Sequence, residues 1–263
     1  MASTSEVGHP KNLANIDKVI DLITQFGATY NPTNPQIALA GITTLKGSCT
    51  TVATNLTATF ITYKNDTNAR KTAFEPVDKL VTATLDNVKT LGVNQQTIDD
   101  VSSIVKKIHG DASNLKANST TNKTVDPSND PTPVEDPTAP ATISTSQQSY
   151  DSVLANFYKL IQLLTAIPSY APNEVNIQIA TLNALYTTLS TANLTAITST
   201  NAYYLARNQR NLVFYAPNTG LCDIMKKVKA YTRQVYGSQS AEYRHMAAIK
   251  FVSFKPKKKT KKK

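Results

Sequence analysis

The sequence is poor in the residues that build reactive sites. Among its 263 residues it has no tryptophan, two cysteines, three histidines and eight glycines. Few glycines leave little material for a phosphate-binding loop, and no GxGxxG, GxxxxGKS/T, GxSxG or HExxH motif occurs. His9, His109 and His245 lack the i, i+4 partner or the convergent ligands that a metal site needs. We therefore expect no catalytic residue, no metal and no cofactor.

Two cysteines are too few for the disulfide framework of a small secreted domain. In the internal alignment described below, Cys49 pairs with Leu189 and Cys222 pairs with Val77. A position that accepts leucine or valine is a core position, so we predict that both cysteines are buried, apolar thiols.

Long hydrophobic runs are also missing. No apolar run approaches the ~18 residues of a membrane-spanning helix. The stretch MASTSEVGHPKN at residues 1–12 has neither the basic n-region nor the apolar h-region of a secretory signal. We expect a cytoplasmic protein with no membrane span.

Positive charge is in excess, and it is unevenly distributed. The chain has 28 Lys and Arg against 18 Asp and Glu, a formal net charge of +10. Residues 1–115 are balanced, whereas residues 152–254 carry nine basic and three acidic groups. The final FKPKKKTKKK adds seven lysines, which repel one another and cannot fold. This asymmetry points to an anionic partner for the C-terminal half.

Two parts of the chain resemble each other, in the same order, over about 95 residues. NIDKVIDLITQFGATYNP (15–32) matches NFYKLIQLLTAIPSYAP (156–172), and DNVKTLGVNQQTIDDVSSI (86–104) matches KAYTRQVYGSQSAEYRHMAAI (229–249). Between them, residues 126–149 hold five prolines and almost no large apolar residue. We predict two duplicated modules at 1–110 and 149–254, a flexible linker at 111–148 and a disordered lysine tail at 255–263.

Apolar residues recur three and four apart in both modules, which indicates helices. One face is formed by Ile16, Val19, Ile20, Ile23 and Phe26, and a longer one by Ile42, Leu45, Cys49, Val52, Leu56, Phe60 and Tyr63. We predict an all-α fold: an elongated helical bundle of two duplicated modules, each with a long spine helix and shorter flanking helices. The spine should begin at Asn34-Pro35 in module one and span much of 173–216 in module two. A third helix is expected at 221–235 and short fourth helices at 95–108 and 239–250, with glycine caps at Gly92 and Gly237. Threonine-rich stretches such as TTVATNLTATFITY keep a β-sheet interpretation open.

Basic and aromatic residues interleave in the second module. The pattern is more typical of a solvated helix face, and it also suits a surface that contacts phosphates and stacks on bases. We predict that Arg70 and Arg207 pin the long helices to a neighbour. The lysine tail would contact phosphates without reading sequence, or would only add solubility. The candidate polyanion-binding residues are Lys255, Lys257, Lys258, Lys259, Lys261, Lys262, Lys263, Arg207, Arg210, Lys226, Lys229 and Arg233.

The stretch LARNQRNLVFYAPNTGLCDIMKKVKAYTRQVYGSQSAEYRHMAAIKF (205–251) resembles a group of uncharacterised, duplicated all-helical proteins of Bacteroidota. The match is carried by Arg207-Asn208, Val213-Phe214-Tyr215, Thr219-Gly220-Leu221, Asp223, Val228-Lys229, Tyr231, Tyr236-Gly237, Ser240 and Tyr243, and QTIDDVSSIVKKIHG (96–110) shares the likeness. The resemblance implies a bacterial, cytoplasmic origin. It implies no activity and assigns no catalytic residue.

Three functional hypotheses follow from the sequence. The first is a non-enzymatic helical-bundle protein that binds a protein partner or itself as a scaffold. The second is a sequence-independent binder of nucleic acid or another polyanion, using the lysine tail and the basic second module. The third is an enzyme with a site between the modules, which would need convergent titratable groups in a deep pocket.

Overall fold

The threonine-rich segments are helical. In the computed structural model, which describes residues 8–110 and 148–253, no strand occurs, so the β-sheet interpretation is wrong. These segments tolerate so many threonines because the hydroxyls along the long helices donate to the backbone carbonyl four residues earlier. Thr43 donates to Leu39, Thr50 to Lys46 and Thr57 to Ala53, over 2.9–3.2 Å. The hydroxyls thus find partners inside the helix, and the backbone ladder stays intact.

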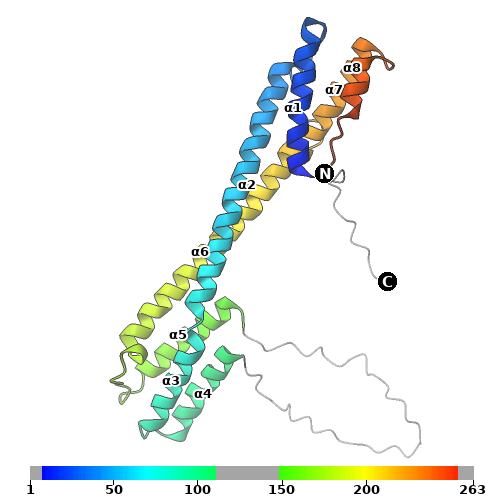
Figure 1. The fold of residues 1–263 in the computed structure, drawn as a ribbon. Coiled ribbons are helices and arrows are strands. Elements are labelled where there is room, and N and C mark those ends of the chain that lie inside the picture. Colours follow the sequence, from blue (N-terminus) through cyan, green and yellow to red (C-terminus); the bar gives the residue numbers. More distant parts are fainter. Residues whose placement is uncertain (1–7, 111–147, 254–263) are drawn as a thin grey trace, which may run out of the picture. The chain divides into compact units, whose positions relative to one another are not determined.

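The described elements follow the predicted helix pattern (Figure 1). They are α1 (His9–Phe26), η1 (Gly27–Thr29), α2 (Leu39–Phe74), α3 (Val77–Thr90), α4 (Gln95–His109), α5 (Tyr150–Thr165), η2 (Val175–Ile177), α6 (Ile179–Tyr215), α7 (Leu221–Tyr236) and α8 (Ala241–Ala248). Gly92 and Gly237 take positive φ angles of 68° and 87° just beyond α3 and α7, as the cap prediction requires. The predicted linker lies almost wholly, and the lysine tail wholly, outside the described residues. None of the described helices combines the length and apolarity needed to cross a bilayer.

The predicted start of the first long helix is wrong by four residues. Asn34 Oδ1 accepts from the backbone N–H of Gln36 at 3.0 Å, which makes a tight turn instead of a helix cap. The turn folds back over the first turn of α2, where a Cβ on Gly41 would lie 2.1 Å from the Pro35 carbonyl oxygen. Tyr30 Oη holds the same segment by donating to the Ile37 carbonyl at 2.9 Å. The chain therefore needs residues 35–38 for this turn, and α2 begins at Leu39.

The described chain forms two compact units, and each draws on both predicted modules. Among the described residues, unit 1 consists of residues 8–67 and 196–253, and unit 2 consists of residues 68–110 and 148–195. Helices α2 and α6 each contribute residues to both units. Modules defined by repeated sequence and units defined by packing are thus different divisions of the chain.

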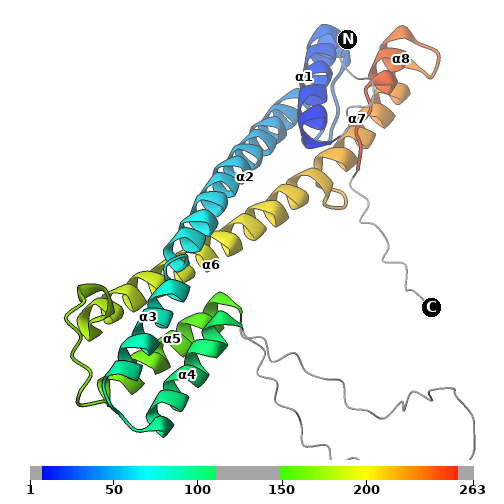
Figure 2. The same cartoon turned by 60° about the horizontal axis from the view of Figure 1, so that its bottom comes forward.

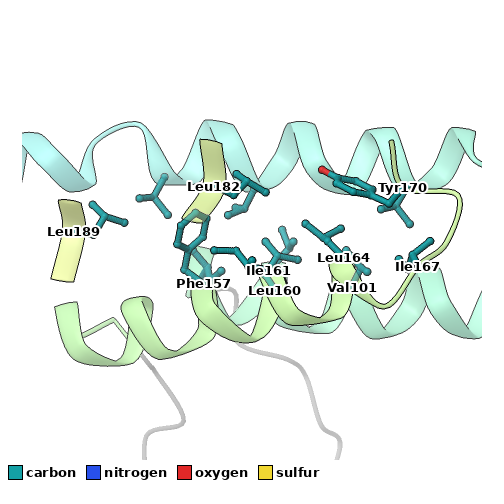
Figure 3. Close-up of a cluster of buried hydrophobic side chains, with 14 residues drawn as sticks. Val101, Phe157, Leu160, Ile161, Leu164, Ile167, Tyr170, Leu182 and Leu189 are labelled. Atoms are coloured by element: carbon teal, nitrogen blue, oxygen red, sulfur yellow. The ribbon is translucent and has the colours of Figure 1, made fainter. Parts of the chain in front are cut away.

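Unit 2 is built on α5. Phe157, Leu160, Ile161 and Leu164 of this helix are fully buried. They pack with residues of α3, α4 and the first part of α6, including Val101, Leu182 and Leu189 (Figure 3). Figure 2 shows α3, α4 and α5 side by side. Each such side chain stabilises the unit by about 1.5–3 kcal/mol through removal of apolar surface from water.

Unit 1 has the corresponding core around α1. Ile16, Val19 and Ile23 of α1 are buried against α2, α7 and α8. The other fully or nearly buried members of this core are Tyr30, Ile37, Ile42, Cys49, Phe214, Leu221, Ile224, Met225, Val228 and Met246. The burial pattern places Val77, Val81, Thr84 and Val88 of α3 in register with Leu221, Met225, Val228 and Thr232 of α7. It therefore pairs Val77 with Leu221, one residue away from the Cys222 of the sequence alignment.

Two local contacts recur in the two units. Tyr170 Oη donates to the Ile177 carbonyl at 2.8 Å, as Tyr30 does to Ile37. In unit 2 the Tyr150 ring meets Phe74 edge-on at 4.9 Å. In unit 1 the His9 ring meets Phe214 edge-on at 5.4 Å.

Candidate functional site

The described residues offer no reactive constellation. Among them, no group of three or more His, Cys, Asp or Glu side chains is placed to hold a metal ion. Cys49 and Cys222 are free and buried, as predicted. Burial raises the pKa of the Cys49 thiol to about 12 and that of the Cys222 thiol to about 11. Both thiols are therefore protonated near neutral pH and are poor nucleophiles.

His9 is held by unit 1 in its neutral form. Its Nδ1 lies 2.5 Å from Tyr215 Oη. Burial, and then the nearby Arg210 guanidinium, lower the pKa of His9. A neutral imidazole packed on Phe214 is a structural group at this position.

The candidate cations of the second module differ in what they contact. Arg207 is exposed, and its guanidinium lies over the rings of Tyr203 and Tyr204, 5.7 and 5.9 Å from their centroids. Arg210 is half-buried and donates to Asn211 Oδ1 at 2.8 and 3.2 Å, and burial lowers its pKa.

The three candidate cations of α7 also differ. Lys226 is exposed and pairs with Asp223 at 2.7 Å, while Arg233 is exposed. Lys229 donates to the carbonyls of Ala247 and Ile249 at the end of α8, and burial lowers its pKa. This arrangement stabilises the end of α8. Lys229 is therefore a structural residue, and its ammonium group is not free to contact a polyanion.

Arg70 fixes α2 within unit 2, as predicted. Its Nη1 donates to Asn193 Oδ1 of α6 at 3.1 Å, and its guanidinium lies 4.1 Å from the Tyr150 ring centroid. Asn193 in turn donates to Asp151 at 2.7 Å. The Arg207 guanidinium instead lies over tyrosine rings of its own helix, so the prediction was wrong for this residue.

A group of partly exposed rings and cations lies in unit 1, where rings of α2 and α6 are in contact. It consists of Phe60, Tyr63, Lys64, Tyr203, Tyr204 and Arg207, and we call it the aromatic cluster. The Tyr63 and Tyr203 rings are parallel within 7° at 5.3 Å, and Phe60 lies 5.5 Å from Tyr203. Lys64 Nζ lies 5.6 and 5.5 Å from the centroids of Phe60 and Tyr63. These distances allow cation–π attraction on the rings of both helices.

Sequence reasoning missed half of this cluster. Phe60 and Tyr63 follow the apolar spacing of α2, so the pattern assigns them to a core face. In the structure Phe60 is 41% exposed, and its ring contacts Tyr203 of α6 instead of a core residue. The signal that could have found them is the alignment of Tyr63 with Tyr203, which gives a tyrosine at the same place on both long helices.

The two compact units differ in charge. In its described residues, unit 1 carries twelve Lys and Arg against five Asp and Glu, a net charge of +7. The described residues of unit 2 carry seven of each, so its net charge is zero. The excess positive charge of the described residues thus lies in unit 1, whereas the sequence alone places it in the second half of the chain.

The end of the described chain is attached to unit 1. Asn12 is fully buried; its Nδ2 donates to the Val252 carbonyl at 2.9 Å, and its Oδ1 accepts from the Val252 N–H at 3.0 Å. Asn15 donates to the Lys250 carbonyl at 2.9 Å. The seven tail lysines, which follow residue 254 in the sequence, therefore continue from a segment fixed to α1.

Comparison with protein-family models, curated proteins and solved structures gives no match.

Proposed function

We propose that this protein acts by non-covalent binding and not by catalysis, and that unit 1 binds a polyanion. The observation that carries the proposal is the charge difference between the units, +7 against zero in the described residues. Concentrated positive charge raises the local concentration of anionic ligands and speeds their association. The lysine tail would extend this surface, because it follows the segment fixed by Asn12 and Asn15.

The proposal is tested with heparin, a polyanion without bases, and two matched double variants. Lys226→Gln with Arg233→Gln removes two cations from α7 in unit 1, and Lys106→Gln with Lys107→Gln removes two exposed cations from α4 in unit 2. We expect the α7 pair to weaken heparin binding about fivefold and the α4 pair less than about twofold. A chain ending at Phe254 should lose about tenfold and show a shallower salt dependence. Equal losses from the two pairs, or no binding by the intact chain, would contradict the proposal.

A protein partner or a second copy of the chain is the second candidate. It is favoured by exposed apolar side chains on α6 in unit 1, with Leu205 69% and Leu212 58% exposed. The two leucines lie two turns apart on one face of the helix, and exposed apolar surface of this kind can mark an interaction surface. We expect Leu205→Ser with Leu212→Ser to convert a self-associated chain into a monomer in light scattering at high salt. An intact chain that is already monomeric at all concentrations would exclude self-association.

We further propose that the chain arose by duplication of a helical module and that it functions in the bacterial cytoplasm. The recurring Tyr30 and Tyr170 hydrogen bonds and the matched ring pairs support the duplication. The resemblance to duplicated all-helical proteins of Bacteroidota supports both parts. Two free thiols also fit a reducing compartment.

A further inference from the structure

The aromatic cluster exposes more ring surface than a helical unit needs. Phe60 is 41% and Tyr204 54% exposed, and neither belongs to the hydrophobic core of either unit. Burial of ring surface stabilises a helical unit, whereas exposed rings contribute little to it. Grouped, exposed rings are thus better explained by a ligand than by folding.

Charge around the cluster favours an anionic ligand. Helix α6 has no Asp or Glu over its 37 residues, and Asp66 is the single acid of α2. Lys64 lies over the rings that α2 contributes, and Arg207 lies over those that α6 contributes. The Arg207 guanidinium lies over the Tyr203 and Tyr204 rings and forms no ion pair with an acidic side chain of the described residues, and a guanidinium has five N–H donors that suit phosphate oxygens.

From these features we infer that the aromatic cluster binds single-stranded nucleic acid. Bases would stack on the exposed rings, chiefly Tyr204, while Lys64 and Arg207 would contact the backbone phosphates. Every base has a π-face, so such a site tolerates any sequence. A duplex offers the same phosphates but keeps its base faces stacked inside. The inference deepens the proposed function and rests on it, since it assigns a ligand class to the positively charged unit.

The test uses the full chain and a fluorescein-labelled oligothymidine of about 20 nucleotides. Tyr204→Leu keeps an apolar side chain but removes the ring. Tyr158→Leu is the matched control, because Tyr158 is a 44% exposed tyrosine on α5 of unit 2. A third variant, Tyr204→Phe, keeps the aromatic ring and removes only the hydroxyl. Circular dichroism melting curves check that the variants are folded.

Stacking on one base is worth about 1–3 kcal/mol, so Tyr204→Leu should raise the dissociation constant at least about fivefold. Tyr158→Leu and Tyr204→Phe should change it less than about twofold, and the affinity for heparin should not follow the loss. Equal binding of oligothymidine by the wild type and Tyr204→Leu would overturn the inference and leave the proposed function standing. The inference would also be overturned, with the proposed function left standing, if a duplex or an acidic polypeptide displaced the labelled oligothymidine at the same concentration as an unlabelled single strand does. If the intact chain binds neither heparin nor oligothymidine, the inference and the proposed function both fail.

Discussion

Phe157→Ala is expected to lower the free energy of unfolding by about 3–5 kcal/mol, the usual cost of removing a buried phenylalanine. Phe157 is fully buried in the core of unit 2, among residues of α3, α4, α5 and α6. The alanine would leave a cavity that the packed neighbours cannot fully close. Urea unfolding followed by circular dichroism measures the loss. Tyr158→Ala, on the exposed side of the same helix, is the control and should cost less than about 1 kcal/mol.

Which helices lose stability in Phe157→Ala shows which helices pack in one unit. Hydrogen exchange after Phe157→Ala should speed up in α3 and α4, which precede the predicted linker, and should spare α7 and α8, which share a predicted module with Phe157. Faster exchange in α7 and α8 with unchanged protection in α3 and α4 would show instead that the sequence modules are the packing units.

Asn12→Ala is expected to detach the end of the described chain from α1. The substitution removes both hydrogen bonds to the Val252 backbone and should cost about 1–3 kcal/mol. It should also uncover Cys222, whose Sγ lies 3.6 Å from the Val252 carbonyl oxygen. We expect labelling of Cys222 at pH 8 to accelerate at least about tenfold, because access to water lowers a thiol pKa that burial now holds at about 11.

Cys49 provides an internal reference for this experiment. It is fully buried among other residues of unit 1, and its labelling rate should stay low in the Asn12→Ala protein. Asn208→Ala removes an exposed asparagine of α6 and should change neither rate. Parallel acceleration at both cysteines would mean that unit 1 as a whole had been loosened.

Helix positions and buried faces were largely predictable from the sequence. Apolar spacing identified Ile16, Val19 and Ile23 as a buried face of α1, and the lack of Gly and Pro identified α6 as a single long helix. These features depend on residues close in the sequence, where periodicity is informative. The start of α2 was missed because an Asn-Pro pair suits a turn as well as a helix N-cap, and here the Asn34 and Tyr30 side chains hold the turn.

The partners of each face were not predictable in the same way. An apolar stripe indicates that one face of a helix is buried, but it does not indicate which helix packs against that face. For this reason the sequence could not show that α5 packs with α3 and α4, or that Phe60 and Tyr63 meet Tyr203. It also could not distinguish Lys229, which holds the end of α8, from the exposed Arg233 one turn later.

The division of the chain into units has a consequence for its synthesis. Unit 2 is complete once residue 195 has left the ribosome, whereas unit 1 needs residues 8–67 and 196–253 together. At about 5–20 residues per second, α1 waits on the order of ten to forty seconds for α7 and α8. During that time Ile16, Val19 and Ile23 have no C-terminal helices to cover them. The unit that is encoded first is therefore finished last, and its nascent apolar face is the part of the protein most exposed to aggregation or to capture by a chaperone.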